Sequence, residues 1–338
     1  MRILLVRLGS LGDVVHGLPV AAALRAALPD AVLDWLVDAR YLPLLDLVPV
    51  LDGRIAVSPS AKGFLAAVGA LRRRRYDVAF DLQGLWKSAV LARASGAPRV
   101  IGFSREHLRE PGARLFYTEA GTAPSGGHVI GKNLSLLGAL GIDAPPGAAR
   151  FPIAVPESAV ADAVRRRLGL GAGAPFAIVN PGAAWPNKRW PPERFGRLAA
   201  ALAGRHGLRS AVTWGPGDEA LAAAVAAASE GAAVVAPPTS IADLLVLSGA
   251  ARLVVSGDTG PLHLAAALGT PVVALFGPTD AARNGPWAPD DVTVSRFEEC
   301  GCRWRRRCTR PTPCLQEIGD DEVLRAVERR LASGPARG

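Results

Sequence analysis

The stretch VVSGDTGPLHLAAALGTPVVALFGPTD, residues 254–280, decides the fold class of this chain. Its pattern predicts a buried strand, a tight turn, a short helix, a second buried strand and a second loop. Two strands joined through a helix run parallel, because parallel pairing needs a crossover connection of this kind. We therefore expect a parallel sheet that helices cover on both faces.

The same alternation of strands and helices runs through the whole chain, and it starts anew after a connection at residues 141–175 that is rich in proline and glycine. Expected strands of the first set are MRILLVRL, VLDWLVD, YDVAFDLQ and PRVIGF, and those of the second set are FAIVNPG, LRSAVTWG, AAVVAPP, ARLVVSGD and PVVALFGP. This pattern predicts an α/β protein with two Rossmann-like domains that face each other across a cleft. The expected boundaries are residues 1–150 for the N-terminal domain, 172–318 for the C-terminal domain, and 319–338 for a C-terminal helix and tail, with packing on the N-terminal domain as one alternative.

The composition favours an anionic partner without identifying it. The formal net charge is +9 and the isoelectric point is near 10.1, which suits nucleic acid, an acidic membrane surface or a phosphorylated substrate. A general bias toward arginine is the alternative, since the only lysines are Lys62, Lys87, Lys132 and Lys188. We find no apolar run of the roughly 18 to 20 residues that a spanning helix needs, and the N-terminus lacks the pattern of a signal peptide. These features predict a soluble, cytoplasmic protein.

The first turn between strand and helix, LGSLGDVVHG, has Gly9 and Gly12 and places an acid at the start of the helix. It lacks the G-x-G-x-x-G spacing, and Asp13 stands at the start of the helix, where a carboxylate would repel a pyrophosphate. Asp13 is therefore a helix cap or a general base that projects from the end of a strand. An NAD-dependent oxidoreductase, with Asp34 as its ribose ligand, is an alternative that this turn disfavours.

The corresponding turn of the second half, SGDTGPLHLAAALG, predicts an anion site. Pro261 suits the first turn of a helix because its missing N–H group would have no partner there. The N–H groups of Thr259, Gly260 and Leu262 are then free to bind a phosphate. We expect Asp258 to orient the turn or to accept a hydrogen bond from a ligand hydroxyl, and His263 to reach the phosphate, although a buried core histidine is the alternative.

Together these motifs resemble glycosyltransferase family 9, the lipopolysaccharide heptosyltransferases. The similarity rests on the opening LGSLGDVVHGLP, on NPGAAWPNKRWPPERFGRLA and WGPGDE, and on SGDTGPLHLAAALGTPVVALFGPTDAARNGPW. It covers nearly the whole chain and implies the GT-B architecture, with an N-terminal acceptor domain and a C-terminal donor domain. The segments DLQGLWKSA and LREPGARLFY are most similar to the members that add the first heptose to the Kdo of Kdo2-lipid A.

The resemblance also implies roles for individual residues. The proposed catalytic base of the family falls on Asp13, and a lysine that contacts the donor phosphates falls on Lys188. The donor-binding positions fall on Glu219, Asp258, Thr259, Gly260 and His263, and those of the acceptor on Gly12, Gln83, Lys87, Arg109, His128 and Lys132. Three positions depart from the pattern: Lys132 stands where an arginine is usual, and Ala183 and Ala184 stand where related enzymes often carry hydroxyl groups near the phosphates.

The reaction implied by this resemblance is an inverting transfer of heptose from ADP-heptose that needs no metal ion or other cofactor. Asp13 would take the proton of the acceptor hydroxyl, and Lys188, His263 and a helix N-terminus would stabilise the leaving ADP. The expected location is the cytoplasmic face of the inner membrane, as a peripheral protein, and nucleic acid has no part in the reaction. Alternatives are another acceptor or nucleotide sugar within the family, and a non-catalytic sugar-nucleotide-binding protein, which would not need Asp13.

All four cysteines fall in one segment, CGCRWRRRCTRPTPC, as Cys300, Cys302, Cys308 and Cys314. Reduced structural thiols, a zinc site and disulfides remain open, because the spacing is not a standard zinc pattern and structural disulfides are rare in the cytosol. The arginines between them favour a solvated charged surface or contact with lipid headgroups.

Overall fold

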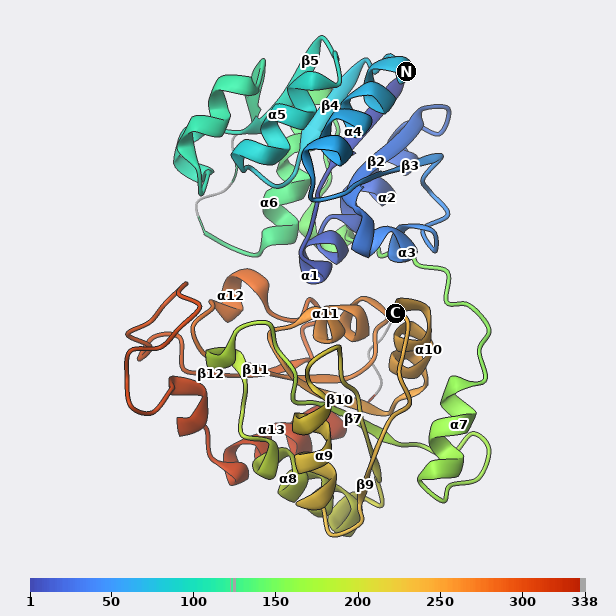
Figure 1. The fold of residues 1–338 in the computed structure, drawn as a ribbon, viewed down its shortest axis with the longest axis vertical. Helices are drawn as coiled ribbons and strands as arrows, with labels where there is room; N and C mark the ends of the chain where they lie inside the picture. Colours follow the sequence, from blue (N-terminus) through green and yellow to red (C-terminus); the bar gives the residue numbers. More distant parts are fainter. Residues whose placement is uncertain (122, 124–125, 335–338) are drawn as a thin grey trace. The chain divides into compact units, whose positions relative to one another are not determined.

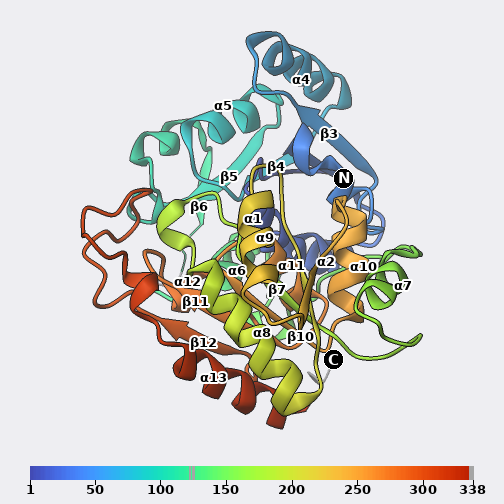
Figure 2. The same ribbon diagram turned by 60° about the horizontal axis from the view of Figure 1, so that its bottom comes forward.

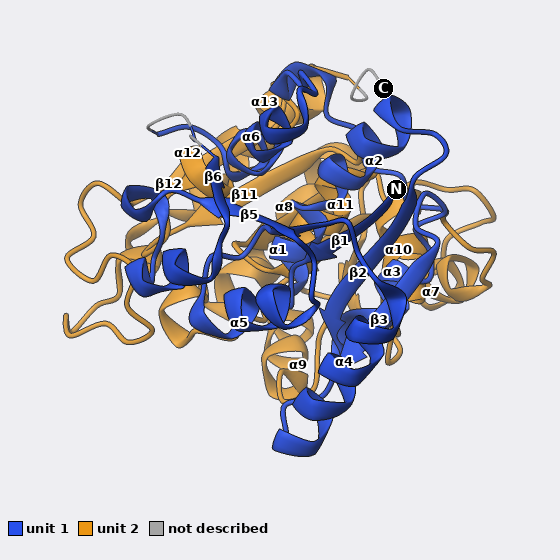
Figure 3. Ribbon diagram, turned by 90° about the horizontal axis from the view of Figure 1, so that it is seen from above, with its two compact units in different colours: residues 1–154 blue, residues 155–338 orange. Residues whose placement is uncertain are grey.

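The computed structural model describes residues 1–121, 123 and 126–334 of the 338-residue chain. The chain divides into two compact units, residues 1–154 and residues 155–338 (Figure 3). The division falls inside the segment that the sequence predicts as the connection between domains. Each unit is built around its own six-stranded sheet.

The sheet of the first unit has the order β3-β2-β1-β4-β5-β6, and all its pairs are parallel (Figure 1). Its strands are β1 (Arg2–Val6), β2 (Val32–Asp38), β3 (Gly53–Val57), β4 (Val78–Asp81), β5 (Arg99–Phe103) and β6 (Glu119–Gly121). Its helices are α1 (Leu11–Val15), α2 (Leu18–Ala27), α3 (Leu42–Leu45), α4 (Ala61–Arg74), α5 (Trp86–Ala94) and α6 (Val129–Ser135). The central strand β1 is apolar on both faces from Ile3 to Val6 because helices cover it from both sides.

The sheet of the second unit repeats this topology with the order β12-β11-β10-β7-β8-β9. Its strands are β7 (Ala177–Asn180), β8 (Ser210–Val212), β9 (Ala233–Val235), β10 (Leu253–Gly257), β11 (Val272–Phe276) and β12 (Val292–Ser295). Its helices are α7 (Val160–Arg167), α8 (Pro192–His206), α9 (Glu219–Ala227), α10 (Ile241–Ala250), α11 (Gly260–Ala267), α12 (Ala281–Asn284) and α13 (Asp320–Ala332). One core layer contains apolar residues of α8, α9 and α13, and α8 lies beside both other helices (Figure 2). The other layer contains residues of α7, α10 and α11.

The α/β prediction with two Rossmann-like sheets is confirmed. In both units the first strand in sequence lies inside the sheet, with the second and third on one side and the fourth to sixth on the other. The strand predictions missed β3, β6 and β12, which lie at sheet edges. An edge strand is short and only partly buried, so its residues show a weaker apolar pattern than those of a central strand.

Two segments differ from the sequence predictions. Helix α7 lies inside the predicted connection, yet Ala161 and Val164 belong to the core of the second unit. The C-terminal helix α13 packs on β11, β12 and α8 of the second unit, where Val323 and Val327 are fully buried. The helix therefore belongs to the second unit, whose core its apolar stripe completes beneath β12, and packing on the N-terminal domain stays a prediction.

Among the described residues, no helix combines the length and the apolar character that crossing a membrane requires.

Candidate functional site

In a sheet of this order, ligands bind at the carboxyl edge between the first and fourth strands, where successive connections leave in opposite directions. This position lies between β1 and β4 in the first unit and between β7 and β10 in the second. Asp13 follows β1 and Gln83 follows β4, whereas Asp258 follows β10. The predicted base Asp13 and the predicted donor residue Asp258 therefore lie at the switch points of the two sheets, whereas Glu219 follows β8.

Asp13 has two sets of partners in the first unit. Its Oδ1 accepts a hydrogen bond from Arg7 Nη2 at 2.5 Å, and its Oδ2 accepts from Ser10 N at 2.9 Å and from Ser10 Oγ at 3.1 Å. Burial would raise the pKa of this carboxyl, but the charge of Arg7 and these hydrogen bonds outweigh burial and hold the pKa below its ordinary value of 3.8. The predicted capping role is confirmed, since Asp13 accepts from the N-cap residue of α1. The carboxylate stays ionised and is still about a third exposed.

A buried arginine and a buried acid, neither of them predicted from the sequence, hold the loops around Asp13. The Arg7 side chain is 7% exposed and also donates to the Leu82 carbonyl after β4. Asp81 accepts from the N–H groups of Gln83 and Gly84 and from two hydroxyl groups, while burial raises its pKa. Gln83 itself accepts from the N–H group of Leu8 at 2.8 Å. The β4–α5 loop is thus fastened to the loop that leads into α1.

The β1–α1 loop requires glycine at its tip. Gly9 has φ +155, and a Cβ atom at this position would lie 2.5 Å from the ring of Tyr41. Gly12, predicted on the acceptor side, is buried in the first turn of α1. The structure gives Gly12 a packing role and leaves Asp13 as the exposed chemical group of this turn.

The predicted acceptor residues fall into two groups. Lys87, at the start of α5, and Arg109, in the loop after β5, are exposed. Lys132 instead donates to the His107 carbonyl at 2.5 Å and lies 4.5 Å from the centre of the Phe103 ring. Its ammonium group therefore stabilises the segment after β5.

His128, the remaining predicted acceptor residue, is the N-cap of α6. Its Nδ1 accepts from the N–H group of Ile130 at 3.2 Å, and its ring packs edge-to-face on His16. This ring pair links α6 to the segment after α1.

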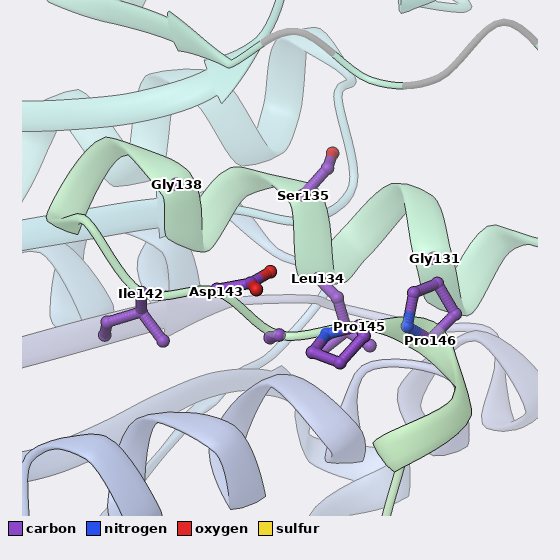
Figure 4. Close-up of a pocket in the computed structure, with 9 residues that line it drawn as sticks. Gly131, Leu134, Ser135, Gly138, Ile142, Asp143, Pro145 and Pro146 are labelled. Carbon is purple, nitrogen blue, oxygen red and sulfur yellow. The ribbon is translucent and has the colours of Figure 1, made fainter.

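The first unit contains a small cavity and a larger groove. The cavity, about 260 Å³, lies between α6 and the segment Ile142–Pro146, and glycine, proline and apolar groups line most of it around the Asp143 carboxylate (Figure 4). None of the predicted site residues lines it. The groove, about 610 Å³, is lined by Lys87 and by the start of α4, including Phe64 and Leu65. Leu65 is 70% exposed, so the groove combines a cation with an open apolar surface.

Asp258 is the centre of the site in the second unit. Its Oδ2 accepts from Lys188 Nζ at 2.5 Å and from Thr279 Oγ1 at 2.7 Å. His263 Nε2 lies 3.0 Å from its Oδ1 and donates, because an ionised carboxylate can only accept. Burial opposes ionisation, but the hydrogen bond and charge of His263 and the charge of Lys188 hold the pKa of Asp258 far below its ordinary value of 3.8.

This arrangement changes what the predicted donor residues can do. Asp258 orients the turn, as one of the two sequence expectations states, and it fixes Lys188 and His263. His263 is buried, with one ring nitrogen on Asp258, which favours a positioning role over direct contact with a phosphate. Lys188 is held on the Trp185 ring at 4.5 Å, and Asp258 occupies only one of its three N–H donors.

A buried amide supports the turn at the start of α11. Asn180, the last residue of β7, donates through Nδ2 to Ser256 Oγ at 3.1 Å and to Thr259 Oγ1 at 3.2 Å. Thr259 is the N-cap of α11, and Gly260 is the first helical residue. Gly257 allows the close approach of the Lys188 loop, since a Cβ atom there would lie 2.8 Å from the Lys188 carbonyl oxygen. Asn180 was not predicted, although its place at the end of a buried strand was visible in the sequence.

Glu219 begins α9 and is exposed. The preceding Asp218 pairs with Arg189 Nη2 at 3.1 Å, and Arg189 also donates to the carbonyl of Ala183 at 2.9 Å. An added Cβ atom on Gly182 would lie 2.2 Å from the Asp218 carboxylate. The loops after β7 and β8 are thus joined, and Glu219 lies next to this junction.

The four cysteines also lie in the second unit, and all are free thiols. Cys300, Cys302 and Cys314 are buried, and Cys308 packs against them. None of the four forms a disulfide in this structure, and both reduced thiols and a metal site are compatible with it.

Comparison with known proteins agrees with this geometry. Residues 65–312 match the family described as "Glycosyltransferase family 9 (heptosyltransferase)". Lipopolysaccharide heptosyltransferase 1 of Pseudomonas aeruginosa is 32% identical, over 91% of this chain and 88% of that protein. Lipopolysaccharide heptosyltransferase 3 of Escherichia coli is 27% identical, over 95% and 97% of the two chains. The structure of an E. coli heptosyltransferase with ADP superposes with a TM-score of 0.76 at 26% identity, over 98% of each chain.

Two Rossmann-like units with polar groups at both switch points, and the match to solved transferases, define a glycosyltransferase of the GT-B class. The chain belongs to glycosyltransferase family 9. It is a heptosyltransferase of lipopolysaccharide core biosynthesis.

Proposed function

We propose that this enzyme transfers L-glycero-D-manno-heptose from ADP-heptose to the Kdo of Kdo2-lipid A, with inversion at the anomeric carbon. The observation that carries the donor side is the arrangement around Asp258, which holds Lys188 at the switch point where α11 begins. The E. coli relative solved with ADP supports an adenine nucleotide as the leaving group.

Lys188 would bind the diphosphate of the donor. Its ammonium group is 15% exposed and fixed between Asp258 and the Trp185 ring, so binding a phosphate costs little side-chain entropy. The N–H groups at the start of α11 add positive potential on the same edge of the sheet. As the bond to the sugar breaks, ADP gains charge, and these groups would stabilise that charge. The transfer therefore needs no metal ion or other cofactor.

Asp13 would accept the proton of the attacking hydroxyl group. The charge of Arg7 keeps it ionised, so the carboxylate is ready at neutral pH, although it is a weak base. Proton transfer would occur late, when bonding to the anomeric carbon has made the hydroxyl group acidic. Arg7 and Ser10 also restrict the carboxylate to one orientation.

The groove at Lys87 supports an acylated and phosphorylated acceptor. Phe64 and Leu65 offer apolar surface beside the ammonium group, and α4 ends with Arg72, Arg73 and Arg74. A helix with an exposed leucine and a cluster of arginines suits the surface of an anionic bilayer. We therefore place the enzyme at the cytoplasmic face of the inner membrane, as a peripheral protein.

A transfer assay read by mass spectrometry tests this function. ADP-heptose is offered with Kdo2-lipid A, and separately with an acceptor that already carries core heptoses. The expected product is Kdo2-lipid A with the mass of one added heptose, formed at least roughly 10²-fold more slowly by Asp13→Asn and at the normal rate by the control Asp52→Asn. Transfer only to the heptosylated acceptor would contradict the Kdo assignment and favour the second candidate, a later core transfer, which the similarity to heptosyltransferase 3 suggests.

A further inference from the structure

The loop between β12 and α13 brings three buried sulfur atoms together, and a fourth cysteine packs against them. These four residues, Cys300, Cys302, Cys308 and Cys314, are called here the cysteine cluster. The sulfur atoms of the three buried members all lie within 4.8 Å of one another. Cys300 Sγ is 3.3 Å from Cys302 Sγ and 3.0 Å from Cys314 Sγ. Cys308 is partly exposed and packs against these three.

These separations fit one metal ion better than the other structures that cysteines form. A zinc–thiolate bond of about 2.3 Å places the sulfurs of a tetrahedral site roughly 3.8 Å apart; this is longer than the two pair separations of 3.0 and 3.3 Å and inside the 4.8 Å within which all three sulfurs lie. A disulfide joins sulfurs in pairs and gives no reason for a third sulfur at similar distance. An iron–sulfur cluster distributes its four cysteines over two or four iron atoms, and so spreads the cysteine sulfurs further apart than a single ion does.

The surroundings of the sulfurs resemble the outer shell of a metal site. The Asn187 side-chain amide lies 3.6 Å from Cys302 Sγ and donates to the Arg305 carbonyl at 2.9 Å. Such donors stabilise bound thiolates. Four thiolates around a divalent ion carry a net negative charge, and the same loop supplies positive charge as Arg303, Arg305, Arg306, Arg307 and Arg310. The arginine run would thus balance the negative charge of the thiolates, in addition to forming a solvated surface.

The loop between the cysteines buries few of its own side chains. Residues 303–307 and 309–312 are exposed, so little apolar surface offsets the entropy of ordering them. A bound ion would supply this free energy, as it does in small metal-binding domains. We propose that the cysteine cluster binds one structural zinc ion in a closed, tetrahedral four-thiolate site.

The ion would brace the loops that hold Lys188 and Thr279. Asn187, which contacts the cluster, precedes Lys188 in a single helical turn, Pro186–Lys188. On the other side, the N–H group of Trp304 donates to the Pro278 carbonyl at 2.8 Å, next to Thr279, which donates to Asp258. Loss of zinc is therefore expected to loosen Lys188 and weaken ADP binding, a consequence that rests on the proposed function.

Metal analysis of the full-length protein tests the site directly. The protein is purified without chelators, or reconstituted with ZnCl2 under reducing, anaerobic conditions, and zinc and free thiols are counted per chain. The expected result is one zinc per chain, released when a mercurial reagent blocks the four thiols. Cys308→Ser and Cys314→Ser should each lose most of this zinc, whereas Thr309→Ser, in the same exposed loop, should retain it. Replacement by Co²⁺ should give the charge-transfer and visible bands of tetrahedral cobalt thiolate.

Three outcomes would overturn the proposal. These are a chain that binds no zinc after reconstitution, zinc content unchanged in both cysteine variants, and a purified protein whose cluster holds iron or disulfides instead. Cys308 is the least buried ligand, so the fold of Cys308→Ser can be verified by circular dichroism before its zinc is counted. None of these measurements depends on transfer activity, so failure of the proposed reaction would leave the zinc result unaffected.

Discussion

Replacing Asp13 with asparagine removes a proton acceptor while it preserves the size of the side chain and most of its capping ability. The structure shows that the substitution also costs a hydrogen bond, which lowers the free energy of unfolding beyond what capping preference predicts. The two carboxylate oxygens accept separately, one from Arg7 and the other from Ser10, and an amide has only one acceptor oxygen. One of these hydrogen bonds is lost, so we expect Asp13→Asn to lower the free energy of unfolding by about 1 to 2 kcal/mol. Asp13→Ala leaves Arg7 and the helix end without their acceptor and should cost about 2 to 4 kcal/mol.

Turnover should fall much further than stability in Asp13→Asn. Loss of a general base lowers turnover by roughly 10² to 10⁴, and ADP affinity should stay unchanged because the donor residues lie in the other unit. Initial rates of ADP release and urea unfolding are measured on the same preparations. Asp52→Asn is the matched control, since Asp52 also pairs with an arginine and accepts from a backbone N–H group. It should lose some stability and keep normal turnover.

The pH profile provides an independent readout. The pKa of Asp13 lies below 3.8 in the folded protein, so the carboxylate stays ionised down to about pH 5. Protonation of Asp13 should therefore cause no loss of wild-type turnover above that pH. If Asp13→Asn turned over within about threefold of wild type, far from the effect of a missing base, Asp13 would be only a structural acceptor for Arg7 and Ser10. The base would then have to be sought elsewhere.

Three further predictions concern the donor cluster and the acceptor. Lys188→Met should weaken ADP binding at least roughly tenfold by calorimetry, since it removes a charge-assisted contact. The control Lys62→Met, at an exposed lysine, should leave ADP affinity unchanged. Equal ADP affinities of wild type and Lys188→Met would remove Lys188 from the donor site. Asp258→Asn should destabilise the protein most at neutral pH. A carboxylate with a depressed pKa stabilises the fold fully above the ordinary value of 3.8, and this stabilisation is lost as the pH falls. Urea unfolding at several pH values should show the difference in unfolding free energy between wild type and variant shrinking in acid, and a constant difference would contradict this reasoning. Turnover on Kdo2-lipid A should fall with rising salt as Lys87 and Arg109 are screened from the anionic acceptor, and a salt-independent KM would argue against this acceptor surface.

The sequence by itself determined the local structure and, through it, the position of the chemistry. Apolar runs of strand length followed by glycine-bearing turns placed Asp13 in the first turn of the helix that follows β1 and Asp258 directly after β10, and Pro261 marked the start of α11. These features depend on neighbouring residues, whose periodicity and turn preferences can be recognised without a partner. The edge strands β3, β6 and β12 and helix α7 were missed because partial burial and flanking proline and glycine weakened that local signal.

Only the tertiary structure decided which of these groups are partners. Lys188 meets Asp258 across 70 residues of sequence, Arg7 joins Asp13 to the carbonyl of Leu82, and Cys314 reaches Cys300 across a loop of arginines. Each contact depends on the order of strands in a sheet or on the path of a loop across it. That order follows from how helices cover both faces of the sheet, a property of the whole unit that no short segment encodes. The same burial turned His263 inward onto Asp258 and fixed Lys132 on the Phe103 ring, although both side chains had been expected to face a ligand.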